Sequence, residues 1–397
     1  MTVEALKTEP QSQKRRVTIL GSTGSIGCNT VDLVERESDL YDVVALTANS
    51  NVTKLIEQAK SLRPKYAVIG REDLLPELEQ GLKGTGIDVA GGRDAVIAAG
   101  AMEADWVMAA IMGAAGLAPT LEAVRQGNVV GLANKETLVC AGEVFTKELE
   151  TAQATMLPVD SEHNAIFQVF DFDQAERVNR IILTASGGPF RTWAKEDMTD
   201  ITPEQAVAHP NWSMGAKISV DSATMMNKGL ELIEAYHLFP VSSEQIEIVV
   251  HPQSVIHSMV EYIDGSVLAQ MGTPDMRTPI GYALGWPDRI STPSAKLNFA
   301  ELKTLNFEEP DLERFPALVC ARDTLNAGGA APAILNAANE IAVDAFLKKN
   351  IAYLDIVTIV RETLSQVANR PLLNLDTVYD VDREARLCAE KLVQAKA

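Results

Sequence analysis

The stretch Arg16-Val-Thr-Ile-Leu-Gly-Ser-Thr-Gly-Ser-Ile-Gly27 decides the fold of the first part of the chain. Residues 16–20 are rich in β-formers and predict a strand, residues 21–27 form a glycine turn, and residues 28–37 have helical spacing. In this context the glycines let the backbone approach a pyrophosphate at the positive end of the helix. The spacing is GxxGxxG and not GxGxxG, so a tight turn that binds nothing is the alternative. The position after a first strand favours dinucleotide binding.

Alternating strands and helices continue outward from this turn. Apolar and β-branched runs predict further strands, and stretches with helical spacing lie between them. The strands are expected at residues 41–48, 66–69, 106–111 and 128–133, and the helices at residues 53–62 and 117–125. This order predicts βαβ units, a parallel sheet and a Rossmann-like dinucleotide domain over residues 17–157.

Composition restricts the partners of the 397-residue chain. Its formal net charge of −19 would repel nucleic acid and anionic membranes, so we expect neither as a partner. No apolar run approaches the roughly 18 residues that a membrane span needs. The four cysteines have no CxxC spacing, which indicates reduced thiols and a cytoplasmic protein. Residues 1–16 are polar and are expected to be a disordered leader and not a secretory signal.

The distribution of polar residues along the sequence changes at about residue 158. Dense polar blocks follow, and all five histidines lie between residues 163 and 257, which indicates a central α+β catalytic domain over residues 158–297. Residues 254–262 and 266–271 predict a hairpin around Asp264-Gly265. Residues 298–315 are acidic and predict a linker. Residues 316–397 are rich in Ala and Leu and predict a C-terminal helical domain.

An acidic pair follows the strand-like run 156–159. Asp160 and Glu162 can converge on one hard cation, although helix N-capping by Asp160 is the simpler explanation. A third carboxylate is expected from residues 219–238, where a strand end at Val220 precedes a helix. On that helix Asn227, Lys228 and Glu231 can crowd one side; a solvated Lys–Glu pair is the alternative.

Residues 186–215 lie between two predicted strands, 181–185 and 217–220, and form either a disordered loop or an active-site lid. Trp193, Trp212 and His209 favour a lid, because a closing loop needs apolar faces to exclude water. At the end of the strand 128–133, Asn134 and Glu136 are expected to face a nicotinamide, with Lys135 toward the substrate.

The cofactor preference depends on the end of the second strand. An acidic residue there would hydrogen-bond a ribose 2′-hydroxyl and repel a 2′-phosphate. The chain has instead the neutral donors Asn49, Ser50 and Asn51, so we expect NADPH in preference to NADH.

Taken together, these blocks resemble the 1-deoxy-D-xylulose 5-phosphate reductoisomerase family of the bacterial and plastid isoprenoid precursor pathway. The resemblance covers residues 17–393. Besides the glycine turn, its carriers are LANKE (132–136), PVDSEHNA (158–165), SGGPFR (186–191), HPNWSMG (209–215) and VDSATMMNKGLE (220–231). At Asn49 and Ser50 the chain departs from the family, many of whose members have a glycine and a basic residue there.

The resemblance implies an NADPH- and metal-dependent rearrangement and reduction of a sugar phosphate. Mg²⁺ or Mn²⁺ would be held by Asp160, Glu162 and Glu231. The implied substrate contacts are Lys135, Ser161, Ser186, His209, Trp212, Ser222, Asn227, Lys228 and Glu231, with Lys135, His209 and Glu231 as catalytic residues. NADPH would contact Thr23, Gly24, Ser25, Ile26, Asn51, Asn134, Glu136 and Gly215. Asp221 is not a ligand in the family and is interpreted as structural.

Two other functions remain open at this point. A dehydrogenase of the homoserine type would share the domain plan without needing three carboxylates, and its turnover would be insensitive to chelators. A dinucleotide-sensing regulator would keep the glycine turn but have no use for the polar blocks. The hairpin around Asp264-Gly265 and the family both predict a homodimer.

Overall fold

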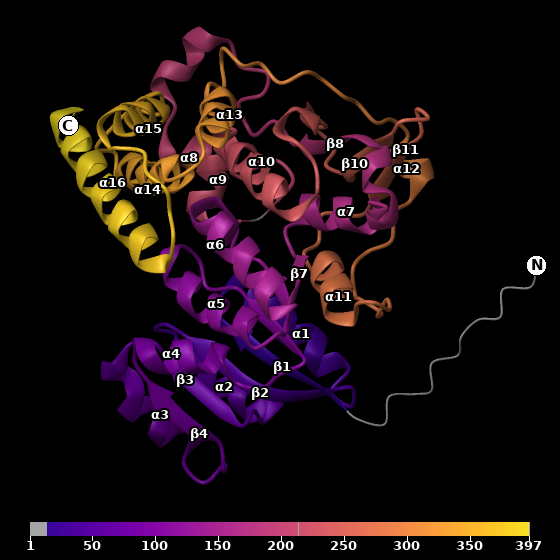
Figure 1. The fold of residues 1–397 in the computed structure, drawn as a ribbon, viewed down its shortest axis with the longest axis vertical. Helices are drawn as coiled ribbons and strands as arrows, with labels where there is room; N and C mark the ends of the chain where they lie inside the picture. Colours follow the sequence, from indigo (N-terminus) through magenta and orange to yellow (C-terminus); the bar gives the residue numbers. More distant parts are fainter. Residues whose placement is uncertain (1–13, 213, 397) are drawn as a thin grey trace, which may run out of the picture.

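The computed structural model describes residues 14–212 and 214–396. Most of the predicted leader therefore lies outside the described residues, and the first strand begins at Arg15. Helices and strands gather in two bodies, with the N-terminal sheet at one end and the C-terminal helices at the other (Figure 1). Within the described residues, the structure contains no helix that is both long and apolar enough to cross a membrane.

The first body is a seven-stranded parallel sheet, which confirms the predicted Rossmann-like fold. Its strand order is β4-β3-β2-β1-β5-β6-β7, so the direction of winding reverses between β1 and β5, where ligands of such sheets bind. The strands are β1 (Arg15–Leu20), β2 (Tyr41–Ala48), β3 (Tyr66–Ile69), β4 (Asp88–Gly91), β5 (Trp106–Ala109), β6 (Val129–Leu132) and β7 (Thr155–Pro158).

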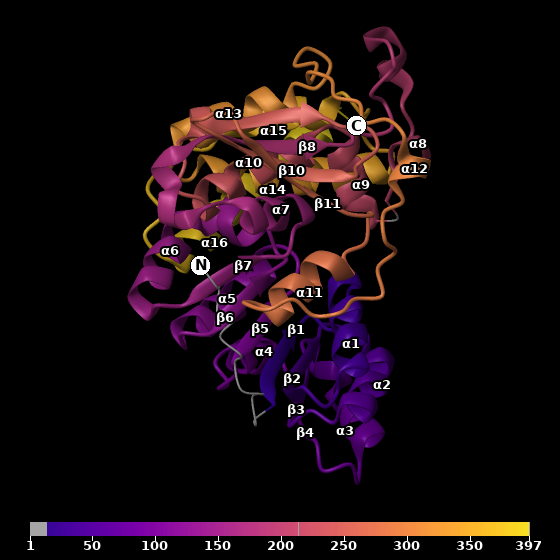
Figure 2. The same cartoon turned by 90° about the vertical axis from the view of Figure 1, so that its right-hand side faces the viewer.

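Helices cover both faces of this sheet (Figure 2). They are α1 (Ser25–Arg36), α2 (Val52–Leu62), α3 (Leu75–Leu82), α4 (Arg93–Gly100), α5 (Leu117–Arg125) and α6 (Glu136–Ala152). α1 begins at Ser25, inside the glycine turn, three residues before the predicted start at Cys28. A much later helix, α11 (Arg277–Gly285), also packs here: its Ile280, Ala283 and Leu284 belong to the same buried cluster as the strand residue Met108.

The second sheet has four strands in the order β11-β10-β8-β9. They are β8 (Val178–Ala185), β9 (Ile246–Val250), β10 (Ile256–Tyr262) and β11 (Val267–Met271). β10 and β11 pair antiparallel, as the hairpin prediction requires. β11 and β9 are the two edge strands, and Val267 and Leu268 on β11 are about half exposed.

The prediction of a strand at residues 217–220 is wrong, because these residues belong to helix α9 (Ala216–Ala223). The alternation in Lys-Ile-Ser-Val favours a strand locally. In the structure, however, Ser219, Val220, Asp221 and Ala223 are buried on a helix that packs against the C-terminal helices. Tertiary packing therefore overrides the local pattern. The helix predicted after it is present as α10 (Met226–Leu238).

Helices make up the C-terminal region, as predicted. They are α13 (Ala317–Ala327), α14 (Ala331–Leu347), α15 (Asp355–Gln366) and α16 (Leu375–Lys396). The predicted linker contains the short helix α12 (Phe299–Leu302), and Glu308 within it forms a β-bridge with Val250 of β9. Two further α-helices lie between the sheets and the C-terminal region in sequence: α7 (Ser161–Val169), which follows β7, and α8 (Pro203–Ala206), inside the predicted lid.

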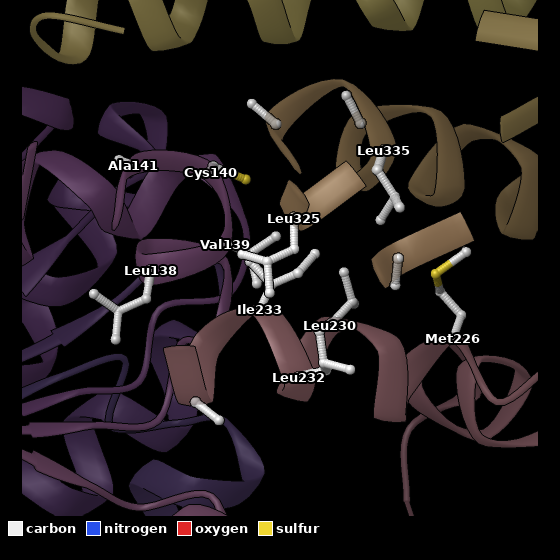
Figure 3. Close-up of a cluster of buried hydrophobic side chains, with 14 of the residues drawn as sticks. Leu138, Val139, Cys140, Ala141, Met226, Leu230, Leu232, Ile233, Leu325 and Leu335 are labelled. Atoms are coloured by element: carbon white, nitrogen blue, oxygen red, sulfur yellow. The ribbon is translucent and has the colours of Figure 1, made fainter. Parts of the chain in front are cut away.

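A hydrophobic cluster joins the two bodies (Figure 3). Val139 of α6 lies beside Ile233 of α10 and Leu325 of α13, and Leu138 and Leu230 belong to the same buried cluster. Burying side chains of this size contributes roughly 1.5–3 kcal/mol each. α6 and α10 are therefore held firmly together, and both carry predicted site residues at their N-terminal ends.

Candidate active site

Adjacent strand ends bring together the first residues of the site. β6 and β7 pair in parallel with Leu132 opposite Pro158, so Lys135 and Asp160 leave neighbouring strands at the same edge of the sheet. Asp160 is the N-cap of α7, and its Oδ1 accepts a hydrogen bond from the Glu162 amide at 3.2 Å. Its Oδ2 accepts one from Lys135 Nζ at 2.9 Å. The two interpretations of Asp160, capping and function, therefore use different oxygens of one carboxylate.

Three carboxylates meet at this edge. Asp160, Glu162 and Glu231 each place one oxygen within 4.8 Å of the others. Two lysines lie among them: Lys135 Nζ is 3.4 Å from Glu231 Oε1, and Lys228 pairs with Glu231 and lies 3.8 Å from Glu162 Oε1. Glu231 is fully buried. The predicted metal ligands are thus brought together from the start of α7 and the first turns of α10.

Nearby cations outweigh the effect of burial at the Asp160 carboxylate but not at the Glu162 carboxylate. Burial raises the pKa of Glu162 to about 8, because it outweighs the Lys228 ammonium, and the other two carboxylates add to the rise. Burial also disfavours the Asp160 anion, but Lys135, His163 and Lys228 together outweigh it and hold the pKa of Asp160 far below its usual range. Glu162 therefore needs a further positive charge. A divalent cation with oxygen ligands would supply that charge, so these residues fit Mg²⁺ or Mn²⁺.

The backbone at the start of α10 allows close packing around the carboxylates and lysines of the site. Met225 precedes it in a left-handed conformation, with φ of 63°. A Cβ at Gly229 would lie 2.7 Å from Ala321 Cβ, so only glycine lets α10 approach α13 this closely. On the opposite side Asn227 donates to Glu231 and accepts from Lys135 Nζ at 2.8 Å. Asn227 and Gly229, which are both poor helix formers, thus lie where packing and side-chain contacts override helix propensity.

His163 and Glu234 lie behind the carboxylates and were not predicted as site residues. His163 is fully buried, and its Nε2 lies 2.9 Å from the Glu231 carbonyl oxygen. Its Nδ1 lies 3.0 Å from Glu234 Oε2, a distance suited to an ion pair but without aligned hydrogen-bond geometry. Burial disfavours the His163 imidazolium, but Glu234, with smaller contributions from Asp160 and Glu231, outweighs it and raises the pKa of His163 to about 9. The sequence signals were the place of His163 in the polar block 158–165 and the spacing of Glu234 three residues after Glu231.

The predicted lid folds back onto the end of β8. His209 Nδ1 accepts hydrogen bonds from the backbone amides of Asn211 and Trp212, at 3.2 and 3.0 Å. The proton of a neutral His209 therefore lies on Nε2, which donates to Ser186 Oγ at 2.9 Å. Burial lowers the pKa of His209 and so favours this neutral form. The centroid of the Trp212 ring lies 6.3 Å from that of the His257 ring. The predicted lid therefore places a large apolar side chain beside the His257 imidazole.

The glycine turn forms a close-packed cradle at the switch point of the sheet. Gly21 has φ of +84°, and a Cβ there would lie 2.7 Å from the Ala110 carbonyl oxygen. A Cβ at Gly27 would overlap the Gly21 carbonyl oxygen. Thr23, Gly24, Ser25 and Ile26 form the turn and the start of α1, and Asn51 caps α2 by accepting from the Lys54 amide. Such a turn fits a dinucleotide pyrophosphate, because Gly24 and Ser25 are exposed at the N-terminal end of α1, the positive end of the helix.

A loop that sequence reasoning overlooked completes this edge. Residues 110–116 follow β5 and lie against Gly21, and Asn134 Nδ2 donates to the Gly113 carbonyl oxygen at 3.2 Å. Its glycines and apolar residues carry no charge or motif, so no signal marked it. Glu136 starts α6 beside Asn134.

The remaining predicted residues lie on α7 and α9. Ser161 Oγ donates to Glu162 Oε2 at 2.9 Å and so joins the carboxylate cluster. Gly215 is the N-cap of α9, and Ser222 is on α9, where its carbonyl oxygen packs against Gly188 of the lid. No hydrogen bond or ion pair among the described residues links Gly215 or Ser222 to the carboxylates.

A dinucleotide-type sheet joined to a buried carboxylate–lysine site defines the class: an α/β enzyme that combines a nucleotide cofactor with a metal site. Comparison with known proteins gives the family. Three family models match the chain. The model described as 1-deoxy-D-xylulose 5-phosphate reductoisomerase matches residues 17–142. The model of the 1-deoxy-D-xylulose 5-phosphate reductoisomerase C-terminal domain matches residues 156–239, and that of the DXP reductoisomerase C-terminal domain matches residues 271–388.

Similar proteins agree with these matches over almost the whole chain. The 1-deoxy-D-xylulose 5-phosphate reductoisomerases of Rhodospirillum centenum and Zymomonas mobilis are 59% and 56% identical to it, over 96% and 97% of this chain and 95% and 99% of theirs. A solved structure of the Zymomonas mobilis enzyme in complex with NADPH has a TM-score of 0.93 at 55% identity, covering 96% of this chain and all of that one. A DOX-P reductoisomerase in complex with NADPH, fosmidomycin and magnesium has a TM-score of 0.90 at 42% identity, covering 96% and 98%.

The chain belongs to the 1-deoxy-D-xylulose 5-phosphate reductoisomerase family. The family predicted from the polar blocks is confirmed, as is the fold class of a Rossmann-like domain followed by mixed and helical regions. As a member of this family, the chain is an NADP-dependent oxidoreductase.

Proposed function

We propose that the chain converts 1-deoxy-D-xylulose 5-phosphate to 2-C-methyl-D-erythritol 4-phosphate with NADPH and a divalent metal ion. The observation that carries this proposal is the meeting of Asp160, Glu162 and Glu231 with Lys135 and Lys228 at the sheet edge. Structures of relatives in complex with NADPH and with magnesium support both cofactors. The reaction belongs to the non-mevalonate isoprenoid precursor pathway.

Asp160, Glu162 and Glu231 would hold Mg²⁺ or Mn²⁺. When bound, the ion supplies a Lewis acid for neighbouring carbonyl and hydroxyl oxygens of the substrate. Lys135 holds the orientation of Asp160 and Glu231 from one side and presents its ammonium to the substrate. Burial disfavours this ammonium, but Asp160 and Glu231 outweigh it and raise the pKa of Lys135 well above its usual value, so Lys135 stays charged.

The substrate phosphate would be bound by Ser186, Ser222, Asn227 and Lys228. Lys228 is buried and in contact with carboxylates, and burial disfavours its charge less than Glu162 and Glu231 favour it, so its pKa is raised. A buried ammonium of this kind can bind a phosphate strongly, because little water competes. Binding the remote phosphate orients the reacting carbons over the carboxylates.

His209 would donate a hydrogen bond from Nε2 to a substrate oxygen near the reacting carbons. Its orientation is set by the two backbone amides at Nδ1, so the donor is arranged before substrate binds. Trp212 on the same segment would exclude water from the rearranging skeleton. Ser161 would lie on the opposite side, with its hydroxyl already oriented toward Glu162.

NADPH would lie along the cradle and supply the hydride for the reduction. The proposed contacts are Thr23, Gly24, Ser25, Ile26, Asn51, Asn134, Glu136 and Gly215. Because no carboxylate stands at residues 49–51, the 2′-phosphate would meet no repulsion there, and NADPH is preferred to NADH.

We further propose a cytoplasmic homodimer formed through the second sheet. β11 is an edge strand with half-exposed Val267 and Leu268, and such an edge can pair with a second copy. The domain limits 17–157, 158–297, 298–315 and 316–397 are part of this proposal.

The test is NADPH oxidation by the wild-type enzyme with and without 1-deoxy-D-xylulose 5-phosphate and Mg²⁺. Turnover should require both, and Glu231→Gln should lose at least about 100-fold in kcat, because it removes the negative charge of a proposed metal ligand. Glu77→Gln, on the exposed face of α3, is the matched control and should retain activity. Turnover that survives a chelator would favour a homoserine-type dehydrogenase, and NADPH binding without turnover would favour a regulator.

A further inference from the structure

Asp221 is a buried carboxylate that the proposed chemistry leaves without a role. It lies on α9 and is 1% exposed. Its Oδ1 accepts a hydrogen bond from Asn339 Nδ2 of α14 at 2.8 Å. Its Oδ2 lies 2.7 Å from Nζ of Lys217, one helical turn earlier. Each oxygen thus has one partner, so the orientation of the carboxylate is fixed.

Lys217 links Asp221 to the part of the site where the proposed cofactor contacts lie. Its Nζ lies 4.0 Å from Oε1 of Glu136, the residue that starts α6 beside Asn134. The Lys217 side chain is one-third exposed, whereas that of Glu136 is mostly buried. A lysine has a long flexible stem, so its ammonium stays at one place only where a partner holds it. Asp221 is that partner.

The C-terminal helices hold this group from behind. Asn339 is fully buried on α14, and the Tyr353 hydroxyl donates to the Ala223 carbonyl oxygen at the end of α9, at 2.6 Å. α9 is therefore attached to the helical region at both its middle and its end. The contacts run in order from Asn339 to Asp221, to Lys217 and to Glu136.

We propose that Lys217 is a positioning residue for NADPH, held by Asp221 and Asn339, which orients the Glu136 carboxylate and the N-terminal end of α9 beside the cofactor. The proposal rests on the proposed function, because it takes Glu136 and Gly215 as cofactor contacts. It assigns the helical region a part in cofactor binding, although none of its helices contributes a proposed cofactor contact. Among the described residues, no ion pair or hydrogen bond links Lys217 to Asp160, Glu162 or Glu231, so the metal site is separate from this contact chain.

The first test is Lys217→Gln, measured by the quenching of protein fluorescence as NADPH binds in the presence of Mg²⁺. The Kd for NADPH should rise about tenfold, the change expected for one partly buried charged contact. The KM for 1-deoxy-D-xylulose 5-phosphate should stay unchanged, whereas the thermal midpoint should fall, because the buried Asp221 carboxylate loses its ammonium partner. Asp344→Asn, which removes the exposed ion pair with Lys348 on α14, is the control and should leave all three values unchanged. An unchanged Kd for NADPH in Lys217→Gln would overturn the proposal.

The second test separates positioning from stability. Asp221→Asn should lower the thermal midpoint and raise the Kd for NADPH. The double variant Asp221→Asn with Asn339→Asp restores an amide–carboxylate contact but moves the charge from α9 to α14, away from Lys217. Its thermal midpoint should recover while its Kd for NADPH stays raised. Recovery of both would show that the effect is one of stability alone and would overturn the proposal.

These binding measurements do not depend on turnover. If the wild-type enzyme bound NADPH but did not oxidise it with 1-deoxy-D-xylulose 5-phosphate, the proposed function would fail while the effect of Lys217→Gln on NADPH binding could still be measured.

Discussion

Lys135 Nζ lies 2.9 Å from Asp160 Oδ2, and both residues extend from the ends of adjacent parallel strands. The ammonium also contacts Glu231, so one lysine joins the carboxylate at the start of α7 to one on α10. Its charge partly offsets a repulsion that would otherwise separate α7 from α10. Lys135 therefore contributes to the stability of the site as well as to its chemistry.

Replacing Lys135 by Met should lower the free energy of unfolding in the absence of metal by about 3 kcal/mol, because it leaves buried carboxylates without a counter-charge. Mg²⁺ should restore a large part of this loss, so metal should stabilise the variant more than the wild type. Urea unfolding with and without Mg²⁺ measures both quantities. Lys147→Met, exposed later on α6, is the control. Equal stabilisation by metal in wild type and variant would contradict the role given to Lys135.

The hydrogen bond between Ser186 and His209 predicts that their substitutions are not additive. Ser186→Ala and His209→Gln should each lower kcat/KM by roughly 10- to 100-fold. The double variant should lose little more than the worse single one, because each change already breaks the shared contact. Steady-state kinetics on the four proteins completes the cycle. Losses that multiply would mean that the two residues act independently.

His237 predicts a dependence of stability on pH. Burial lowers the pKa of His237 to about 4 from its usual 6.5, so the folded protein holds the ring neutral. Between these pH values the unfolded chain binds more protons, and stability rises with pH. The contribution of His237 is therefore fully present above about pH 6.5 and is lost as the pH falls through about 4.

His237→Gln should flatten this part of the profile by about 2 kcal/mol. Urea unfolding at intervals from acidic to neutral pH measures the slope. His209→Gln serves as a comparison from the lid, where burial also lowers the pKa of the ring. The account of His237 is wrong if wild type and variant keep the same slope.

Two glycines of the same turn should respond differently to Ala. A Cβ at Gly27 would overlap the Gly21 carbonyl oxygen, whereas one at Gly24 would lie 3.5 Å from that oxygen, an ordinary contact. Gly27→Ala should therefore destabilise the protein by about 2 kcal/mol and weaken NADPH binding. Gly24→Ala should keep the thermal midpoint of the wild type. Thermal unfolding compares the two, and equal destabilisation would contradict the packing described for this turn.

The sequence predicted most strands of the first sheet, because strand and helix periods are local signals, but the edge strand β4 and the helices α3 and α4 beside it were not predicted. The carboxylate cluster was also within reach, because Asp160 and Glu162 follow a strand directly and Glu231 stands on the same turn as Asn227 and Lys228. The role of Asn339 could not be predicted, since its contact with Asp221 joins residues far apart in sequence and depends on how α14 packs against α9. The strand predicted at residues 217–220 failed for the same reason: local alternation cannot anticipate which face a distant helix will cover.

The packing of α11 has a consequence for the order in which the chain folds. Ile280, Ala283 and Leu284 complete the apolar cluster under the first sheet, although they are synthesised long after its strands. A ribosome that has released only the seven strands has released a domain with one uncovered apolar surface. The N-terminal part should thus remain dependent on chaperones until α11 emerges. Fragments that end before Arg277 should aggregate unless this helix is supplied.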